Sequence, residues 1–238
     1  MATKDKPPIP RESARQPKRT EAAAGLDTAA ERKALRAFKK AWEEALVDYA
    51  ERRLNTEACL QSALYASLRR LLAPPFEIYV DAVVKMPKSD QPGAKRKAEV
   101  DLLICHGDDI VAAIELKFAP RGKPSRQSVK KDVKSLTNLR NRRAKQEQVV
   151  IEMNRYRHEG LPVRTLSIAR TRKLVFAVFC QEEAPAFQTG AFWTAFRLDG
   201  QSVSSPPQFA VAVAGADKDG AATARFFGQP FDRLGGKR

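Results

Sequence analysis

Three ionisable residues, Asp101, Glu115 and Lys117, lie in two otherwise apolar stretches of the chain. These stretches, residues 100–105 and 110–118, are rich in β-formers and are separated by a turn signal that contains a glycine, so they predict a β-hairpin. In the second stretch the even-numbered residues are all apolar, whereas Glu115 and Lys117 share the opposite face. Charges on a strand that is mostly apolar are costly unless they are paired or bind something. We therefore treat these three residues as the candidate site.

The length of the turn decides whether the two carboxylates meet. A loop of three or five residues places Asp101 directly opposite Glu115 with both side chains on one face, whereas a two-residue loop pairs Asp101 with Ile114. Gly107 can supply the positive φ that a three-residue loop with a bulge requires. Glu99 shares the face of Asp101 and is the alternative first carboxylate.

Two carboxylates beside a lysine are typical of a divalent-cation site. Mg²⁺ is commonly held by one or two carboxylates and keeps waters or substrate phosphates as its other ligands. A charged lysine does not bind the metal, but it can hold a phosphate or position an attacking water. The alternative is that the Glu-x-Lys pair at the strand end is a solvated pair at the edge of the sheet.

The pattern Asp-x13-Glu-x-Lys across a hairpin resembles the PD-(D/E)XK (restriction-endonuclease-like) nuclease superfamily. The resemblance covers residues 54–180, in the order helix, strand, strand, strand, helix, strand, and Val100 stands where the family usually has a proline. It implies an α/β fold with a mixed central sheet flanked by helices. The implied activity is metal-dependent hydrolysis of nucleic-acid phosphodiesters, with DNA favoured over RNA.

The resemblance also implies a role for each residue of the hairpin. Asp101 and Glu115, helped by the backbone carbonyl of Leu116, would hold Mg²⁺ or Mn²⁺. The ion would polarise the phosphate and lower the pKa of a bound water. Lys117 would orient that water or stabilise the developing charge.

A helix before the hairpin brings a further acid. Asn55 or Thr56 can cap this helix, which is predicted to end before Pro74. Glu57 and Gln61 continue its apolar stripe at the N-terminal end, and a glutamate on an inward face needs a partner. The resemblance implies that Glu57 completes the acidic cluster as a metal or water ligand, with Gln61 supporting it. The alternative is a carboxylate that is simply favoured by the helix dipole.

The overall charge points to a polyanionic partner. The 238 residues include 43 Lys or Arg and 28 Asp or Glu, a formal net charge of +15, which favours nucleic acid. A helix is predicted from Ser125, with Val129, Val133, Leu136 and Leu139 as its apolar stripe. Six basic residues near the hairpin are predicted to contact phosphates: Lys95, Arg96, Lys97, Lys130, Lys131 and Lys134. The alternative for both groups is a solvated surface.

The chain divides into four predicted parts. Residues 1–27 are predicted to form a flexible basic tail, which either attracts nucleic acid or only aids solubility. Residues 28–53 form an amphipathic helix, residues 54–180 the nuclease-like core, and residues 181–238 an extension of the same domain with short strands. Residues 146–158 are interpreted as an extension of the preceding helix.

Other features bear on location and partners. There is no apolar leader or long apolar run, so no membrane partner is expected, and three cysteines within predicted helix or strands suit a reducing cytoplasm. A homo-oligomer is left open. Two other functions are also left open: a non-catalytic nucleic-acid-binding protein on the same fold, and a basic scaffold or RNA-associated protein.

Overall fold

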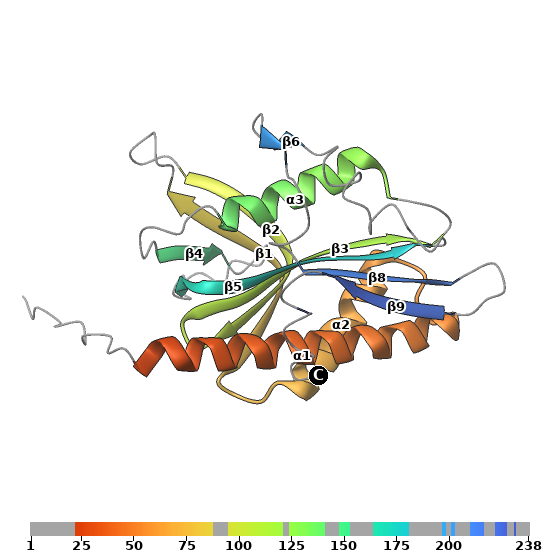
Figure 1. The fold of residues 1–238 in the computed structure, drawn as a ribbon, viewed down its shortest axis with the longest axis horizontal. Coiled ribbons are helices and arrows are strands. Elements are labelled where there is room, and N and C mark those ends of the chain that lie inside the picture. The colour runs from red at the N-terminus through yellow and green to blue at the C-terminus, as the bar shows by residue number, and fades with distance from the viewer. Residues whose placement is uncertain are drawn as a thin grey trace, which may run out of the picture.

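The chain forms a mixed α/β fold in which helices flank a seven-stranded sheet (Figure 1). The computed structural model describes residues 22–87, 95–120, 124–140, 148–152, 164–180, 197–198, 201–202, 210–216, 222–227 and 231. The predicted class, a mixed sheet flanked by helices, is confirmed. The helices are α1 (Ala22–Ala50), α2 (Glu57–Leu71) and α3 (Arg126–Arg140). The strands are β1 (Phe76–Pro87), β2 (Lys95–His106), β3 (Asp109–Ala119), β4 (Gln148–Glu152), β5 (Arg164–Cys180), β6 (Arg197–Leu198), β7 (Gln201–Ser202), β8 (Ala210–Ala216) and β9 (Ala222–Phe227).

The sheet combines antiparallel and parallel pairs. Its order is β3-β2-β1-β4-β5-β8-β9, and β3 also pairs with β5. β5 is parallel to β3 and to β8, while the other pairs are antiparallel. The extra pairing closes β1, β2, β3, β5 and β4 into a ring. Two parallel neighbours need a long crossover connection, and the one between β3 and β5 contains α3.

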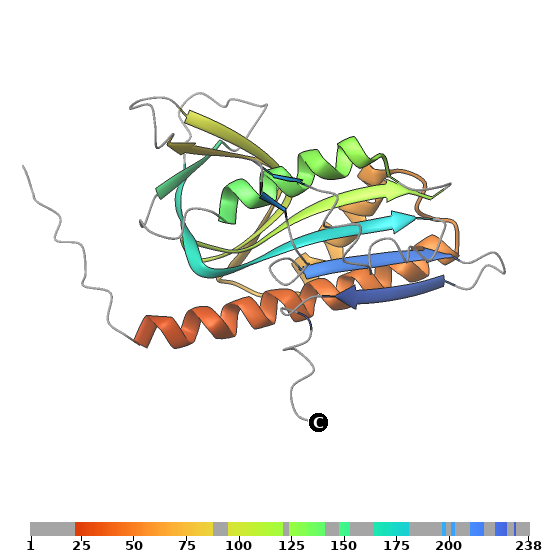
Figure 2. The ribbon, with the colours of Figure 1, turned by 45° about the horizontal axis from the view of Figure 1, so that its top comes forward.

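The helices lie on opposite faces of the sheet. α1 and α2 cover one face and pack against each other, whereas α3 lies on the other face against β2, β3 and β5 (Figures 1 and 2). β3 contacts all three helices. The strand that carries Glu115 and Lys117 is therefore held between both helical layers.

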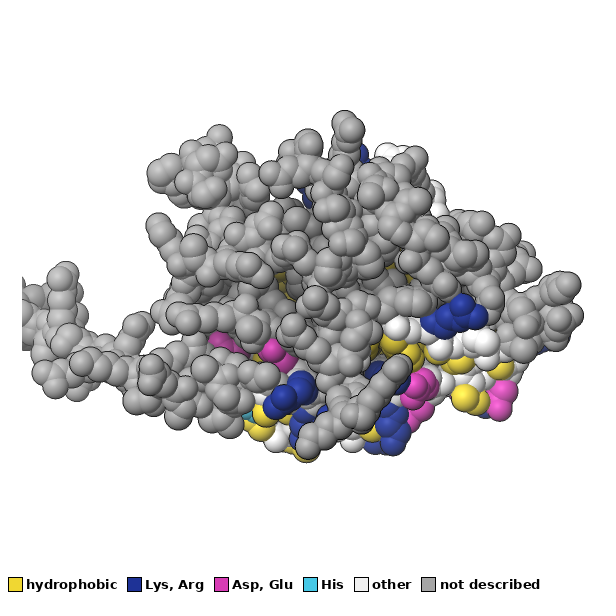
Figure 3. All heavy atoms as spheres, in the orientation of Figure 1, with side chains coloured by type: hydrophobic (Ala, Val, Ile, Leu, Met, Phe, Trp, Pro, Cys, Tyr) yellow, Lys and Arg dark blue, Asp and Glu magenta, His cyan; other side chains and the backbone are white. Residues whose placement is uncertain are grey.

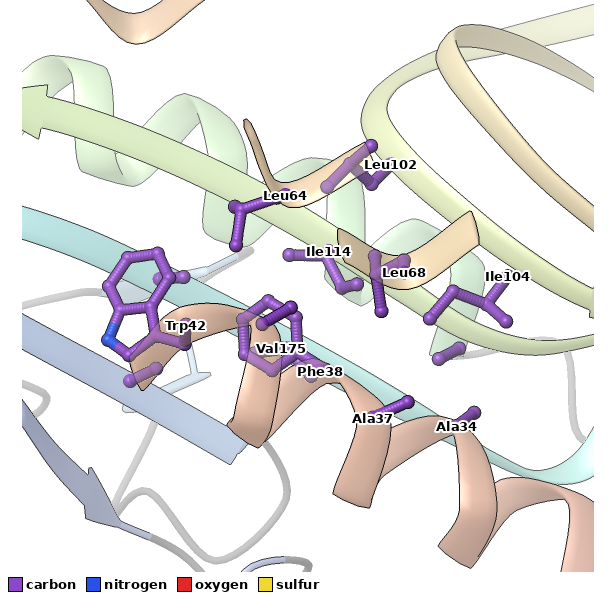
Figure 4. Close-up of a cluster of buried hydrophobic side chains, with 14 of the residues drawn as sticks. Ala34, Ala37, Phe38, Trp42, Leu64, Leu68, Leu102, Ile104, Ile114 and Val175 are labelled. Carbon is purple, nitrogen blue, oxygen red and sulfur yellow. The ribbon is translucent and has the colours of Figure 1, made fainter. Parts of the chain in front are cut away.

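A large apolar core fills the space between the sheet and α1 and α2. On α1, predicted as an amphipathic helix, Leu35, Phe38 and Trp42 are buried. Figure 4 shows the side chains of Phe38 and Trp42 pointing toward the strands. The Trp42 ring lies 4.6 Å from the ring of Phe179, centroid to centroid. The cluster also includes Leu64, Leu68, Leu102, Ile104, Ile114 and Val175. Burial of this face is what holds the two helices in place, since apolar contact supplies the main stabilisation of amphipathic helices.

The second and third helices follow their sequence signals closely. Thr56 is the N-cap of α2, and its hydroxyl accepts a hydrogen bond from Cys59 N at 3.1 Å. Ser125 does the same for α3, accepting from Ser128 N at 3.2 Å. All four residues of the predicted α3 stripe are buried, which confirms its orientation. On α2, Leu60, Leu64 and Leu68 are buried, and Leu71, predicted on the same stripe, is half-buried and packs against the core.

The hairpin has the expected pairing, but it reaches that pairing differently from the prediction. The loop contains two residues, since His106 pairs with Asp109, and Gly107 has the predicted positive φ of 58°. A β-bulge then shifts the register between Cys105–Ile110 and Ile104–Ala112, which leaves Val111 as the extra residue. At a bulge, two residues of one strand lie opposite one residue of the other, so every later pair along the ladder is shifted by one residue.

The bulge has two consequences. The ladder continues to Leu102 opposite Ile114, so the next position places Asp101 opposite Glu115. The bulge also interrupts the alternation of side chains along β3. Val111 joins the core under α1 and α2, while Ile110, which was predicted on that face, is buried outside that cluster.

Three sequence-based boundaries are corrected. Residues 22–27, assigned to the tail, belong to α1, because the alanines there favour helix and no proline interrupts them. Part of the predicted helical extension over 146–158 is strand β4, where three consecutive β-branched residues favour a strand. The prolines and the glycine within residues 86–98 predict a loop there, but the basic run 95–97 lies in β2, because the β1–β2 ladder extends to Pro87 opposite Lys95. Residues 1–21 of the predicted tail lie outside the described residues.

The described surface along α1 carries both charge signs (Figure 3). Lys39 lies 4.0 Å from Glu43 along the helix, and Glu44 accepts a hydrogen bond from Arg70 of α2 at 2.6 Å. Exposed pairs of this kind contribute little stability. Within the described ranges, no helix combines the length and the apolar character that crossing a membrane requires.

Candidate functional site

The site lies where β2 and β3 stop pairing. Beyond Ile114 the N–H groups of Leu116 and Phe118 point to the same edge of β3, because alternate backbone groups of a strand face the same neighbour. Both are bound by carboxylates instead of by backbone. Leu116 N donates to Asp101 Oδ2 at 2.6 Å, and Phe118 N donates to Glu57 Oε2 at 3.0 Å. Where the β2–β3 ladder ends, an acid from β2 and an acid from α2 therefore both accept hydrogen bonds from the backbone of β3.

Asp101, which is half-buried, and Glu115, which is buried, form an acidic pair. Glu115 is only 4% exposed, and the charge of Asp101 acts on its carboxyl. Burial, together with the charges of Asp101 and Asp132, raises the pKa of Glu115 to about 10. Burial also raises the pKa of Asp101, although the Leu116 N–H and the Lys117 ammonium oppose that rise. Two carboxyls this close do not both ionise readily without a nearby cation.

Lys117 lies between carboxylates from two helices. Its Nζ is 3.0 Å from Asp132 Oδ2 on α3 and 3.6 Å from Glu57 Oε1 on α2. Burial acts to lower the pKa of this ammonium, but the charges of Asp132, Glu57 and Asp101 outweigh burial and raise the pKa. Lys117 is therefore a protonated side chain with fixed neighbours.

Asp132 is the residue of this cluster that the sequence-based prediction missed. Its side chain is 8% exposed, and burial raises its pKa to about 6, against the opposing effect of Lys117. The signal was present in the sequence. Asp132 is three residues after Val129 and four before Leu136, so it lies on the buried stripe of α3, and it is the single acid in a strongly basic stretch.

Gln61 forms hydrogen bonds to β1 and β2 next to the acidic cluster. Its Nε2 donates to the backbone carbonyl of Asp101 and to Asp81 Oδ1, each at 2.9 Å. Asp81 has a φ of 50°, in the left-handed region that aspartate tolerates better than most residues. The amide thus links α2 to β1 and β2, beside the carboxylate of Asp101.

The remaining predicted residues lie elsewhere or play a different part. Glu99 is exposed on β2 and is not one of the acids bonded to β3. Leu116 contacts Asp101 through its N–H, and the metal-binding role of its carbonyl stays a prediction. The lysines of α3 predicted to bind phosphate, Lys130, Lys131 and Lys134, are exposed. The side chains of residues 95–97 lie outside those described.

The acidic pair suits a hard divalent cation. Glu115 Oε1 is buried and has no hydrogen-bond partner within the described part of the chain. A cation shared with Asp101 would satisfy that oxygen and offset the negative charge of Asp101, which together with burial raises the pKa of Glu115. In the same described residues, no three Asp, Glu, His or Cys side chains are arranged to hold a metal. The fit thus depends on two carboxylates, a number that Mg²⁺ commonly uses.

Searches for related proteins give no match: no protein-family model, no curated protein and no solved structure matches this chain. The chemistry assigned to the site consequently rests on its residues and their geometry.

The raised pKa of Glu115 predicts an unusual dependence of stability on pH. Between its unfolded value near 4.5 and its folded value of about 10, the folded protein holds a proton that the unfolded chain has lost. Stability from this group therefore falls as pH rises through that window. Without divalent ions, Glu115→Gln should stabilise the protein more at about pH 9 than at about pH 5, because a glutamine binds no proton in either the folded or the unfolded state.

Urea unfolding in EDTA at about pH 5 and about pH 9 measures this effect, since only the change between the two pH values isolates the titrating group. Glu99→Gln is the matched control, because Glu99 is exposed. Equal pH dependence in wild type and Glu115→Gln would contradict the prediction.

Proposed function

We propose that this protein is a metal-dependent nuclease that hydrolyses nucleic-acid phosphodiester bonds, with DNA favoured over RNA. The observation that carries the proposal is the meeting of Asp101, Glu115 and Lys117 at one end of β3, where Glu115 keeps a buried oxygen without a partner among the described residues. The order α2, β1, β2, β3, α3, β5 also agrees with the PD-(D/E)XK core, with β4 as an insertion.

The acids have distinct parts in the proposed mechanism. Asp101 and Glu115 would hold Mg²⁺ or Mn²⁺, with the carbonyl of Leu116 as a further ligand. When bound, the ion would polarise the scissile phosphate and lower the pKa of a coordinated water. Glu57 is half-exposed at 44%, and one of its oxygens already accepts from Phe118 N. It would therefore position a water or the lysine rather than enclose the ion.

Lys117 is the cationic group of the mechanism. Its ammonium carries three N–H donors, so two flanking carboxylates leave at least one donor for a water or a phosphate oxygen. A fixed positive charge beside the reacting phosphate stabilises the negative charge that develops in the transition state. Because the neighbouring acids raise the pKa of Lys117, this group stays charged through the neutral pH range.

One assay tests the function directly. Purified protein is incubated with plasmid, linear duplex and single-stranded DNA and with RNA, in the presence of Mg²⁺, Mn²⁺ or EDTA. We expect cleavage of at least one DNA substrate with Mg²⁺ or Mn²⁺ and none in EDTA. Absence of cleavage under every condition, in protein that still binds DNA, would replace the nuclease with a non-catalytic binder.

The non-catalytic alternative has its own support. Asp101 and Glu57 bond to N–H groups of β3 that would otherwise be unsatisfied. These acids thus have a structural part that does not require catalysis. A nucleic-acid-binding protein built on the same fold would keep the exposed lysines of α3 and lose only the reaction.

Binding should depend on those exposed lysines in either case. Reversing the charges of Lys130, Lys131 and Lys134 to glutamate removes three cations that could neutralise phosphates and release counterions. We expect DNA affinity to fall about equally for unrelated sequences. The slope of log K against log salt should become less negative by roughly 0.9 for each phosphate that the variant no longer neutralises. Fluorescence anisotropy over a salt series measures both quantities.

The matched control is the triple reversal of Arg32, Arg36 and Lys40, which are exposed on α1 at the opposite face of the sheet. It makes the same change in net charge. A control that weakens binding as much as the α3 variant would show that affinity follows net charge rather than this helix.

A further inference from the structure

We infer that Asp132 is a positioning residue, which holds the ammonium of Lys117 at the place where the reaction needs it. This inference rests on the proposed nuclease function. It adds a residue of α3 to a site that is otherwise built from α2, β2 and β3. The juxtaposition that carries it is the 3.0 Å approach of Asp132 Oδ2 to Lys117 Nζ in a nearly closed environment.

Asp132 holds the ammonium more firmly than Glu57 does. The Asp132 side chain is 8% exposed and the Glu57 side chain 44%, and the distance from Glu57 Oε1 to the ammonium is longer, at 3.6 Å. Charge interactions strengthen with shorter distance and with removal from water. Glu57 also accepts a hydrogen bond from Phe118 N, so its carboxylate is shared between the backbone of β3 and the lysine.

A lysine in this position needs such a partner. Its charge sits at the end of a flexible stem of four methylenes, so a single anchor at the backbone does not fix it. Misplacement of a catalytic group by about 1 Å can cost on the order of 100-fold in rate. Asp132 is itself held by α3, whose stripe residues Val129 and Val133 on either side of it are 1% exposed.

The buried and the exposed sides of α3 have different proposed roles, which are positioning of Lys117 and binding of the substrate backbone. Asp132 lies on its buried side, while Lys130, Lys131 and Lys134 are exposed. Removing the carboxylate should therefore lower kcat and leave KM unchanged, because the lysines that would contact the substrate backbone remain. Removing an exposed lysine should do the reverse and raise KM.

The test is a double-mutant cycle on a DNA substrate that wild type cleaves. Asp132→Asn keeps the shape of the side chain and removes its charge, and we expect kcat to fall about 10–100-fold, as is usual for residues that orient a catalytic group. In the Lys117→Ala background the same substitution should cause no further loss, since Asp132 acts through Lys117. Lys131→Ala serves as the contrasting variant, with raised KM and unchanged kcat.

The outcomes separate the two hypotheses. If wild type cleaves, but Asp132→Asn has the kcat of wild type or lowers the rate equally with and without Lys117, the positioning role is wrong. If wild type cleaves no nucleic acid, the nuclease proposal fails and this inference fails with it. Should Asp132→Asn not fold, Asp132→Glu takes its place. That variant keeps the charge but displaces it by one methylene, and wild-type kcat in it would overturn the role.

Discussion

Replacing Glu115 with alanine is expected to lower the rate of cleavage by roughly 10²–10³ while DNA binding survives. The substitution removes one of the two carboxylates that would hold the ion, and leaves the exposed lysines of α3 in place. Loss of a single well-placed electrostatic group typically costs roughly 10²–10³ in rate. Binding should persist, and it should tighten slightly because a negative charge near the phosphates is gone. Single-turnover cleavage and fluorescence anisotropy on one DNA substrate measure the two effects.

Lys117→Ala is the companion variant, because it leaves both carboxylates but takes away the cation. It should lose a similar factor in rate and also keep DNA binding. Glu115→Ala should fold, since it removes a carboxyl from a buried acidic cluster, whereas Lys117→Ala leaves Asp132 buried without its cation and should be less stable. A melting curve checks both variants. Glu99→Ala is the matched control for both: Glu99 is an exposed acid on β2 near Asp101 in sequence. If Glu115→Ala cleaves as fast as wild type, the site is not catalytic.

The hairpin at the centre of this site could be predicted from the sequence because the pattern is local. Alternation of apolar residues and a glycine with positive φ identify two strands and a turn. The bulge at Val111 could not be foreseen, since nothing in the residue types marks it. It nevertheless decides the chemistry, because without it the two-residue loop would place Asp101 opposite Ile114.

Helix faces could be predicted where spacing was regular, and the prediction failed where the segment was short. The stripe of α3 is buried as expected, and by the same spacing Asp132 belongs to it. Asp132 was overlooked although its place on the buried stripe implies a partner, just as the inward face of α2 implies one for Glu57. The helix predicted over β4 was wrong because five residues are too few to distinguish the two periods.

The contact between α2 and β3 also could not be predicted from the sequence. The helical stripe showed that Glu57 faces inward, but it could not show that Phe118 N is the group it would reach. That hydrogen bond depends on where the β2–β3 ladder ends and on the packing beneath β3. An aromatic cluster lies there: the ring of Phe118 is 6.1 Å from those of Phe179 and Tyr49, measured between centroids.

Trp42 extends this aromatic cluster into α1, and its removal should have the largest effect on stability. The side chain is fully buried and its ring contacts Phe179 and Phe38. Truncation of a buried tryptophan to alanine costs about 3–5 kcal/mol, which for a chain of this size lowers Tm by about 6–20 °C. Urea unfolding gives the free energy and calorimetry gives Tm.

Two further variants on α1 test whether the loss of stability comes from the packing of the Trp42 side chain. Trp42 Nε1 is buried and has no hydrogen-bond partner within the described residues, so Trp42→Phe removes an unsatisfied donor while keeping a ring. We expect Trp42→Phe to cost clearly less than Trp42→Ala. Val47→Ala, at a side chain that is 54% exposed, should change stability by less than about 0.5 kcal/mol. A Trp42→Ala protein as stable as Val47→Ala would mean that α1 does not pack on β3 and β5 as described. If Trp42→Ala is destabilised as expected, its cleavage rate should be measured at a temperature where it remains folded. A lowered rate would show that the aromatic cluster, and not the acids alone, fixes the position of Lys117.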